Sequence, residues 1–325
     1  MKLAEIAGKK VQLFFVENLS WFMVLGFYAF FAILKPTGIL KWSTIVFIIY
    51  STLPLAFLVF GEGLCLLSGS LDLSIGQMTG FVGMMAAMIM TKWIPGIPSP
   101  VDIFIPVGLG LACGALNGFV IGTLGLSPFL ATLGTFMIFG GGTFLIRSYP
   151  VYTGFSKLYL SLGGVNVVAI PIAIAFLVVI ELVLRFTRFG THIYAVGGNA
   201  ASSRMLGITP SKMYFSIHTI CGGLCGMSAL FYTGFLGCVP AGMADGTVFL
   251  AFSGAIIGGI GLQGGRGSMV NVLAGVLFLS LIEAGLAMFS VSPFLRRVAY
   301  GILVIVAILL NRFRTSLRDR ILLPE

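Results

Sequence analysis

Long apolar runs dominate this sequence and restrict it to one class of fold. Hydrophobic residues make up 58% of its 325 residues and charged residues only 9%, whereas a soluble domain carries about 25% charged residues. A helix needs about 20 apolar residues to cross the hydrocarbon core of a bilayer, and the chain contains many such runs with its charges between them. The sequence therefore predicts an all-α polytopic membrane protein.

Proline and glycine clusters divide the apolar runs into about ten expected transmembrane helices. We expect an N-terminal interfacial or cytoplasmic segment over residues 1–18, a transmembrane domain over 19–311 and a basic cytoplasmic tail over 312–325. The expected spans are 19–34, 42–60, 73–92, 103–124, 127–147, 164–186, 211–235, 244–262, 268–289 and 293–311.

Basic residues indicate how these spans are oriented. With the N-terminus inside, the inner side holds most of the 19 Lys and Arg residues, and cytoplasmic loops are the ones enriched in them. We therefore expect both termini to be cytoplasmic. The same distribution explains the net charge of +9 without nucleic acid as a partner, because no basic run outside the spans is interleaved with aromatic residues.

Residues for catalysis or metal binding do not converge in the sequence. Cys221 and Cys225 share a helix face, but the chain has only two histidines, and His218 has no convincing set of partners. We interpret the five cysteines as small packing residues, and Glu62 and Glu283 stand alone in apolar runs. No nucleophile, zinc or nucleotide-hydrolysis motif is present. We predict no catalytic residue, metal site or cofactor in this chain, so energy for uphill work would come from a partner.

A polar stretch, SGSLDLSIGQMTG at residues 68–80, separates two apolar runs and contains Asp72. An acid at membrane depth is costly unless it caps a helix or faces a cavity. Its position just before Leu73 and Ser74 predicts an N-cap for the next span. Broken helices of this kind also line cavities in transport proteins, so two interpretations stay open: capping alone, or capping together with forming a wall of a solute path.

The glycine-rich stretch GGIGLQGGRGS, residues 258–268, is only superficially like a phosphate-binding loop. It lacks the Gly-Lys-Ser/Thr ending whose lysine reaches phosphate, and no strand precedes it. We predict a tight inner turn with Arg266 at the cytoplasmic surface.

A second polar stretch, AVGGNAASSRMLGITPSKM at residues 195–213, interrupts the apolar pattern in mid-sequence. Its two glycines permit a sharp turn, Asn199 is a good N-cap for a short helix AASSRML, and Gly207 is a good stop. Thr209 and Pro210 then begin the next span. A helix of two turns is marginal in water, so it either lies on its own protein or the lipid interface, or docks in a groove on a cytoplasmic partner.

Four stretches together carry a resemblance to one family. They are LDLSIG (71–76), LSPFLATLGT (126–135), AVGGNAASSRMLGI (195–208) and IGGIGLQGGRGS (257–268), and they lie in this order. On these motifs the chain resembles, over roughly residues 45–312, the membrane permease subunit of sugar-type ABC importers, the group that includes ribose, galactose and autoinducer-2 permeases.

The resemblance implies a multi-pass subunit of a prokaryotic cytoplasmic (inner) membrane that forms the translocation path for a small sugar or related polyhydroxy solute. Its implied partners are a second permease copy or paralogue, cytoplasmic ATPase subunits that carry ATP and Mg, and an extracytoplasmic solute-binding protein. It also implies a cytoplasmic coupling helix at about 199–207, seated on the ATPase. The residues expected to carry coupling are Gly197, Gly198, Asn199, Ala200, Ala201, Arg204 and Gly207.

The sequence departs from the family pattern just before the glycine turn. Where sugar permeases usually carry an acidic pair, this chain has Val248, Phe249 and Leu250, and its only nearby acid is Asp245. Because of this departure, the resemblance alone does not define the identity of the solute or the extracellular gate at this position. The residues expected along the translocation path are Asp72, Ser74, Asn117, Phe129 and Thr132.

Two rival interpretations remain within transport. One is a related ABC permease for nucleosides or amino acids, and the other is a stand-alone secondary transporter or channel. A secondary transporter needs intramembrane ionisable residues coupled to an ion gradient, which the sequence largely lacks. A polytopic membrane enzyme is disfavoured because no catalytic constellation is present.

Overall fold

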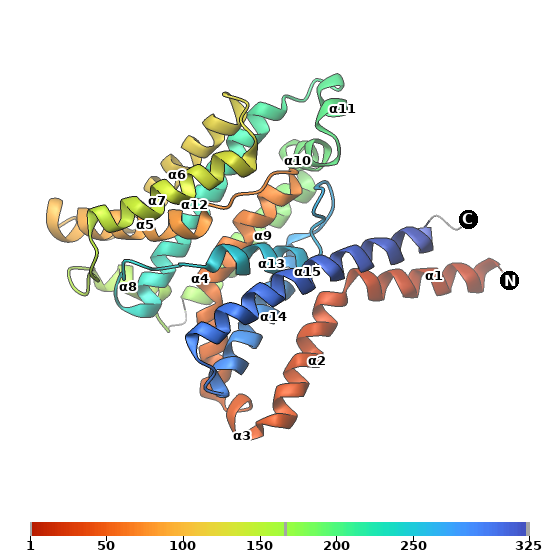
Figure 1. Ribbon diagram of the computed structural model, residues 1–325, viewed down its shortest axis with the longest axis horizontal. Helices are drawn as coiled ribbons and strands as arrows, with labels where there is room; N and C mark the ends of the chain where they lie inside the picture. Colours follow the sequence, from red (N-terminus) through yellow and green to blue (C-terminus); the bar gives the residue numbers. More distant parts are fainter. Residues whose placement is uncertain (1, 166–167, 323–325) are drawn as a thin grey trace.

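Helices account for nearly all of the computed structural model, which describes residues 2–165 and 168–322 (Figure 1). The apolar runs are helical because a chain in hydrocarbon must satisfy its backbone N–H and C=O groups internally. The helices are α1 (Lys2–Glu17), α2 (Leu19–Leu34), α3 (Pro36–Ile39), α4 (Trp42–Leu67), α5 (Ile75–Met88), the π-helix η1 (Ile89–Trp93), α6 (Val101–Gly122), α7 (Pro128–Ile146), α8 (Lys157–Gly163), α9 (Ala169–Phe186), α10 (Arg188–Gly198), α11 (Ala200–Met205), α12 (Pro210–Leu236), α13 (Thr247–Ile257), α14 (Met269–Met288) and α15 (Pro293–Leu322).

Each of the ten expected spans corresponds to a helix, but not every one of these helices can cross a bilayer. Among the described residues seven helices are long and apolar enough, or eight if α1 and α2, which meet at a bend of 66°, count as one span. By contrast, α5 has 14 residues before it runs into η1, and α13 has 11. The expectation of about ten spans, the first and eighth of them short, is therefore confirmed only in part, because irregular segments before α5 and after α13 take up part of those two runs.

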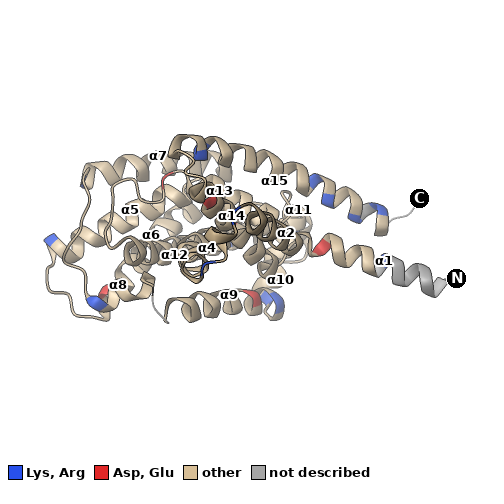
Figure 2. Ribbon diagram, turned by 90° about the horizontal axis from the view of Figure 1, so that it is seen from below, with Lys and Arg blue, Asp and Glu red and all other residues tan. Residues whose placement is uncertain are grey.

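Two helices extend well beyond their expected ends. α4 continues past residue 60 to Leu67, and α15 continues past residue 311 to Leu322. The basic residues expected in a C-terminal tail therefore lie on the last turns of a helix, and Figure 2 shows them gathered towards its free end.

Close contact between α6 and α12 forms the centre of the helix bundle. Glycines recur every four residues along α6, at positions 110, 114, 118 and 122, on the face that meets α12. A Cβ atom at Gly114 would collide with the backbone carbonyl of His218. Small residues let helix backbones approach closely where lipid provides no hydrophobic drive for association. This contact brings Asn117 of α6 and His218 of α12 to the same depth.

The molecule has two distinct ends, which we name for the expected orientation. At the inner end, where both termini lie (Figure 1), Gly198, the 258–268 glycine turn and the last turns of α15 border one open groove. At the outer end, Lys35 Nζ donates to the Met288 carbonyl at 2.7 Å. There too, Val151 and Val239 form an isolated antiparallel bridge, with N···O distances of 3.0 and 2.9 Å.

Candidate functional site

The polar interruption forms a defined short helix at the inner end. As predicted, Asn199 caps α11: its side-chain oxygen accepts a hydrogen bond from the Ser202 amide at 2.9 Å. Gly207 adopts a φ of +80° just after α11, a conformation that favours glycine, and its amide donates to the Arg204 carbonyl at 3.0 Å. Thr209 precedes α12 as expected, although its side chain makes no capping hydrogen bond.

One face of α11 packs on the protein and the other projects outward. Ser203 is only 1% exposed, and its hydroxyl donates to the Asn199 carbonyl at 2.9 Å. Ala201 and Arg204 are exposed. Sequence reasoning missed Met205 and Leu206, which are 89% and 78% exposed. The signal was present, because residues four apart share a helix face and Met205 follows Ala201 by four.

The two glycines before α11 act differently from the prediction. We expected a sharp turn there, but Gly197 and Gly198 are the last residues of α10, and the chain turns at Asn199, which has an extended backbone. Gly197 instead lets α10 lie close to the end of α4 and to the 258–268 turn. A Cβ atom on it would collide with the Leu67 carbonyl of α4 and with the Gly265 amide, whereas one on Gly198 would meet open space.

The 258–268 turn joins α10 to the end of α4. The Gly265 amide donates to the Leu67 carbonyl at 2.8 Å, and the Tyr194 hydroxyl of α10 donates to the Gly267 carbonyl at 2.9 Å. Burial, together with the nearby Glu181 carboxylate, raises the pKa of Tyr194 above its ordinary value, so this hydroxyl stays protonated at physiological pH. The 258–268 turn thus links α10, which leads into α11, to the end of α4, where residues 68–74 begin.

This contact gives a matched pair of variants. Gly197→Ala is expected to destabilise the purified protein by about 1–3 kcal/mol, the usual cost of overpacking, because neither backbone neighbour can move aside cheaply. Gly198→Ala is expected to be neutral or slightly stabilising, since alanine suits a helix better than glycine. Thermal unfolding in detergent measures both. Equal melting temperatures for the two variants would contradict the close approach at Gly197.

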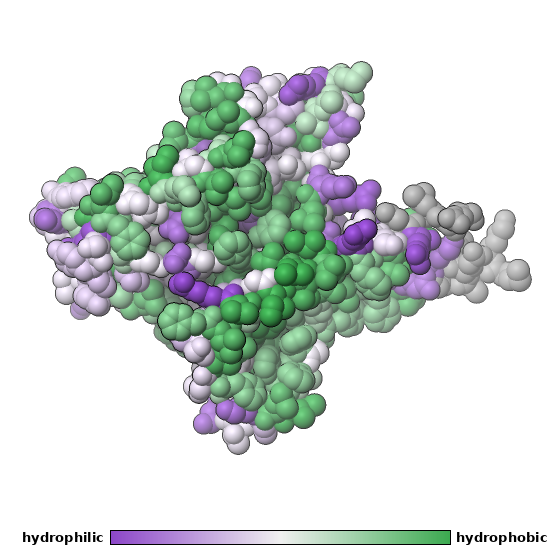
Figure 3. Space-filling view, viewed as in Figure 1, coloured by the Kyte–Doolittle hydropathy of each residue, from purple (hydrophilic) through white to green (hydrophobic). Residues whose placement is uncertain are grey.

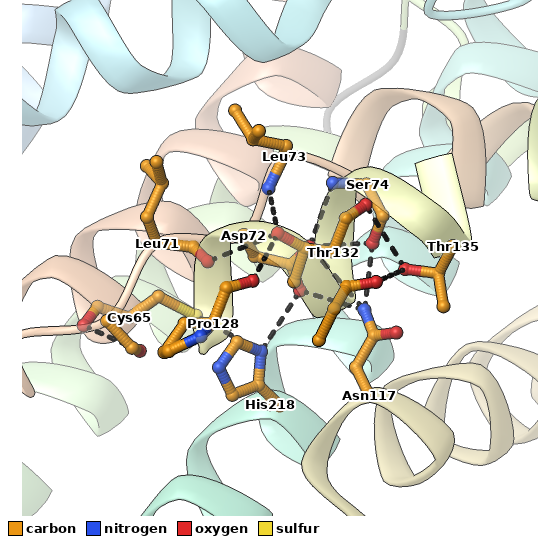
Figure 4. A network of polar contacts seen from close by, with 12 residues as sticks. Cys65, Leu71, Asp72, Leu73, Ser74, Asn117, Pro128, Thr132, Thr135 and His218 are labelled. Carbon is orange, nitrogen blue, oxygen red and sulfur yellow. Dashed lines mark hydrogen bonds and ion pairs between the residues drawn. The ribbon is translucent and has the colours of Figure 1, made fainter. Parts of the chain in front are cut away.

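Asp72 lies at the centre of a buried hydrogen-bond network (Figure 4). Its Oδ1 accepts from the Ser74 amide at 2.9 Å and from the Ser74 hydroxyl at 2.6 Å. Its Oδ2 lies 3.2 Å from the donating Nδ2 of Asn117 and 3.1 Å from Nδ1 of His218. Asn117 also donates to the Ser74 hydroxyl at 2.8 Å. One carboxylate therefore fixes the start of α5 to both α6 and α12.

α7 supports the same segment from another side. The Thr132 hydroxyl accepts a hydrogen bond from the Leu73 amide at 3.1 Å and donates to the Pro128 carbonyl at 2.8 Å. The expected N-cap position falls on Ser74 rather than Asp72, because α5 begins at Ile75. The Asp72 carboxylate closes the turn just before the helix.

His218 is the main residue that sequence reasoning missed. We expected it to lack partners, yet its Nδ1 faces Asp72 and lies 3.9 Å from the Cys65 sulfur. Glu62, also on α4, is buried in the same region, where Asp72 and His218 act on it electrostatically. The available signal was a histidine in an apolar span, since such a residue is costly unless it is paired.

The structure brings four of the five expected path residues together. Asp72, Ser74, Asn117 and Thr132 are each 0% exposed, whereas Phe129 of α7 is 51% exposed and lies outside the network. The four buried residues connect helices in this conformation. Their role in a solute path stays a prediction.

Three potential metal ligands also meet in this network. Cys65 Sγ, an Asp72 oxygen and a His218 nitrogen lie within 4.8 Å of one another. Both Asp72 oxygens already accept hydrogen bonds from protein donors, which accounts for the arrangement without an ion, so the absence of a metal site stays our prediction. Cys221 and Cys225 are buried in α12, and Cys221 packs against Gly61 of α4, consistent with a packing role.

Comparison with known proteins places the chain in a family. Residues 44–308 match the model of the family described as branched-chain amino acid transport system / permease component. The D-allose transport system permease protein AlsC of Escherichia coli (strain K12) is 31% identical over 92% of this chain and 93% of its own length. The ribose import permease protein RbsC of the same strain is 26% identical over 96% of this chain and 99% of its own.

A third relative is the probable ABC transporter permease protein y4mJ of Sinorhizobium fredii, 30% identical over 87% of this chain and 85% of its own length. No solved structure matches the chain. Since the family model covers most of the chain and two relatives reach 30% identity over 85% and 93% of their own lengths, the chain belongs to the permease-component family of branched-chain amino acid transport systems.

Proposed function

We propose that this chain is the membrane subunit of an ABC importer and forms the translocation path for a small sugar or related polyhydroxy solute across the cytoplasmic membrane. The observation that carries the proposal is the similarity to permeases named for D-allose and ribose over 92% and 96% of the chain. In such an importer the permease moves the solute, and ATP and Mg bind to a separate ATPase subunit.

In this proposal α11 is the coupling helix. Its outward face presents Ala201, Arg204 and Met205 to the cytoplasmic ATPase, and ATP-driven closure of that partner presses on α11. The contact of Gly197 with Leu67 passes the displacement to the end of α4. From there the Asp72 network passes it to α5, α6 and α12.

The remaining partners are assigned to other surfaces. A solute-binding protein would dock on the outer loops at 148–163 and 236–246, which the Val151–Val239 bridge holds together. A second permease copy or paralogue would cover part of the apolar exterior, for example the exposed face of α15 with Ile302, Ile305 and Leu309.

A branched-chain amino acid is the second candidate solute, because the family description names such systems. The test is uptake of labelled monosaccharides by cells that carry the complete importer, with and without this chain. We expect the chain to be required for monosaccharide uptake and an excess of leucine to leave it unchanged. Uptake of labelled leucine that requires this chain, with no uptake of any monosaccharide, would favour the second candidate.

A further inference from the structure

A cavity of about 750 Å³ opens towards the outer end, between α4, α12, α13, α14 and α15. Its volume falls within the roughly 300–1,000 Å³ of ordinary small-molecule sites. Figure 3 shows hydrophilic side chains inside an otherwise apolar face of the molecule, left of its centre. The polar side chains that line the cavity include Ser51, Tyr232, Thr247, Ser280, Glu283 and Tyr300.

Glu283 is the feature that most needs explanation. It lies in the outer third of α14, a helix apolar and long enough to span a bilayer, and its side chain is exposed. Tyr300 and Arg296 of α15 are its polar neighbours. Acids within transmembrane segments are rare, face water-filled cavities and mark solute pathways. Glu283 lines the cavity, so its carboxyl group faces this space between the helices.

Ser280, one turn before Glu283 on α14, is a second polar residue in the cavity lining. It is 3% exposed, and its hydroxyl has no partner in the part of the chain that the structure describes. Buried hydroxyl groups are normally satisfied by protein or water. A polar ligand or a water molecule in the cavity would satisfy this one.

The remaining walls combine aromatic surface with a charged mouth. Phe47, Phe235 and Phe249 contribute ring surface to the lining. At the mouth, Arg297 lies 3.5 Å from Asp245. Asp245 also accepts a hydrogen bond from Gln77 of α5 at 3.1 Å, so its charge is already balanced.

We propose that this outer cavity is a binding site for one polyhydroxy solute molecule within the permease itself. The proposal rests on the proposed function and names a place where that solute is held after release from the binding protein. The Glu283 carboxylate accepts hydrogen bonds from neighbouring solute hydroxyls, the Ser280 and Tyr300 hydroxyls complete the polar contacts, and the aromatic rings pack against C–H faces. Charge-assisted hydrogen bonds of this kind are about twice as strong as neutral ones.

The site is distinct from the coupling segment. Glu283 lies near the outer end of α14, whereas α11 and the glycine turn lie at the inner end. Changes in the cavity are therefore expected to affect solute transfer without affecting assembly with the ATPase.

The test compares Glu283→Gln and Tyr300→Phe with Lys41→Gln, a change at an exposed residue outside both the cavity lining and the outer loops at 148–163 and 236–246. Each variant is assembled with the ATPase and the binding protein and reconstituted in liposomes. We expect Glu283→Gln to lower the initial rate of monosaccharide uptake about tenfold or more and Tyr300→Phe to lower it less. Basal ATP hydrolysis, copurification of the ATPase and thermal stability should stay at the level of Lys41→Gln, because glutamine keeps the shape of glutamate and phenylalanine keeps the ring of tyrosine.

Failure of the cavity proposal and failure of the proposed function give different results in this test. If the unchanged importer takes up monosaccharide and both cavity variants do so at the same rate, the cavity proposal is overturned and the proposed function stands. If the unchanged importer takes up a branched-chain amino acid and no monosaccharide, the proposed function fails, and the polyhydroxy assignment of the cavity fails with it.

Discussion

Asp72→Ala is expected to prevent stable accumulation of the protein in the membrane. The substitution leaves the Ser74 amide and hydroxyl, the Asn117 amide and the His218 ring facing a space without an acceptor. Each buried polar group left unsatisfied costs about 1–3 kcal/mol, so losing several hydrogen bonds at once removes a large fraction of the roughly 5–15 kcal/mol that stabilises a typical folded protein. Membrane-fraction immunoblots and thermal unfolding in detergent measure the effect.

The matched control is Asp245→Ala, since Asp245 is an exposed acid whose side chain is 50% exposed. We expect it to accumulate normally, because exposed ion pairs contribute about 0–1 kcal/mol. Asp72→Asn should fall between the two, since its remaining oxygen can still accept from Ser74 while its amide faces the donors on Asn117 and His218. Normal accumulation and stability of Asp72→Ala would show that the network does not hold α5 to α6 and α12.

Ala201→Glu combined with Arg204→Glu is expected to abolish solute-stimulated ATP hydrolysis while leaving the permease folded. Both side chains are exposed, so the free permease should lose no more than about 0.5 kcal/mol. At a docked surface, charge reversal and added bulk cost several kcal/mol, and about 1.4 kcal/mol corresponds to a factor of ten in affinity. We therefore expect at least a tenfold loss of stimulation, measured as phosphate release by the assembled importer.

Arg185→Glu serves as the control for this pair. It reverses an exposed charge at the same end of the molecule, but on α9 rather than α11. Solute-stimulated ATP hydrolysis by the Arg185→Glu importer should stay close to that of the unchanged importer. Full stimulation of ATP hydrolysis by solute in the Ala201→Glu/Arg204→Glu variant would show that α11 does not couple the permease to the ATPase.

Features determined by neighbours in sequence were predictable. The Asn199 cap and the stop at Gly207 depend on contacts within three or four residues, and both positions were predicted correctly. The apolar runs likewise identified each long helix, because hydrocarbon leaves a spanning segment no other way to satisfy its backbone.

Features that depend on distant contacts were not predictable from one sequence. His218 meets Asp72 across 146 residues, and no spacing rule relates them. Gly197 was interpreted as a hinge, whereas its function is to let α10 approach Leu67 and Gly265. Glu283 was recognised as a solitary acid in an apolar run, but only the packing of α4, α12, α13 and α15 around it reveals a cavity.

The central claim is that this chain moves solute only when an ATPase works on it. The most direct measurement is monosaccharide uptake into liposomes that contain the purified permease, with the ATPase, ATP and the solute-binding protein each supplied or omitted. The account predicts uptake only when all three are present, and the Ala201→Glu/Arg204→Glu variant should stay inactive even then. Uptake by the permease alone, driven by a solute or ion gradient, would contradict the account and identify a stand-alone transporter or channel.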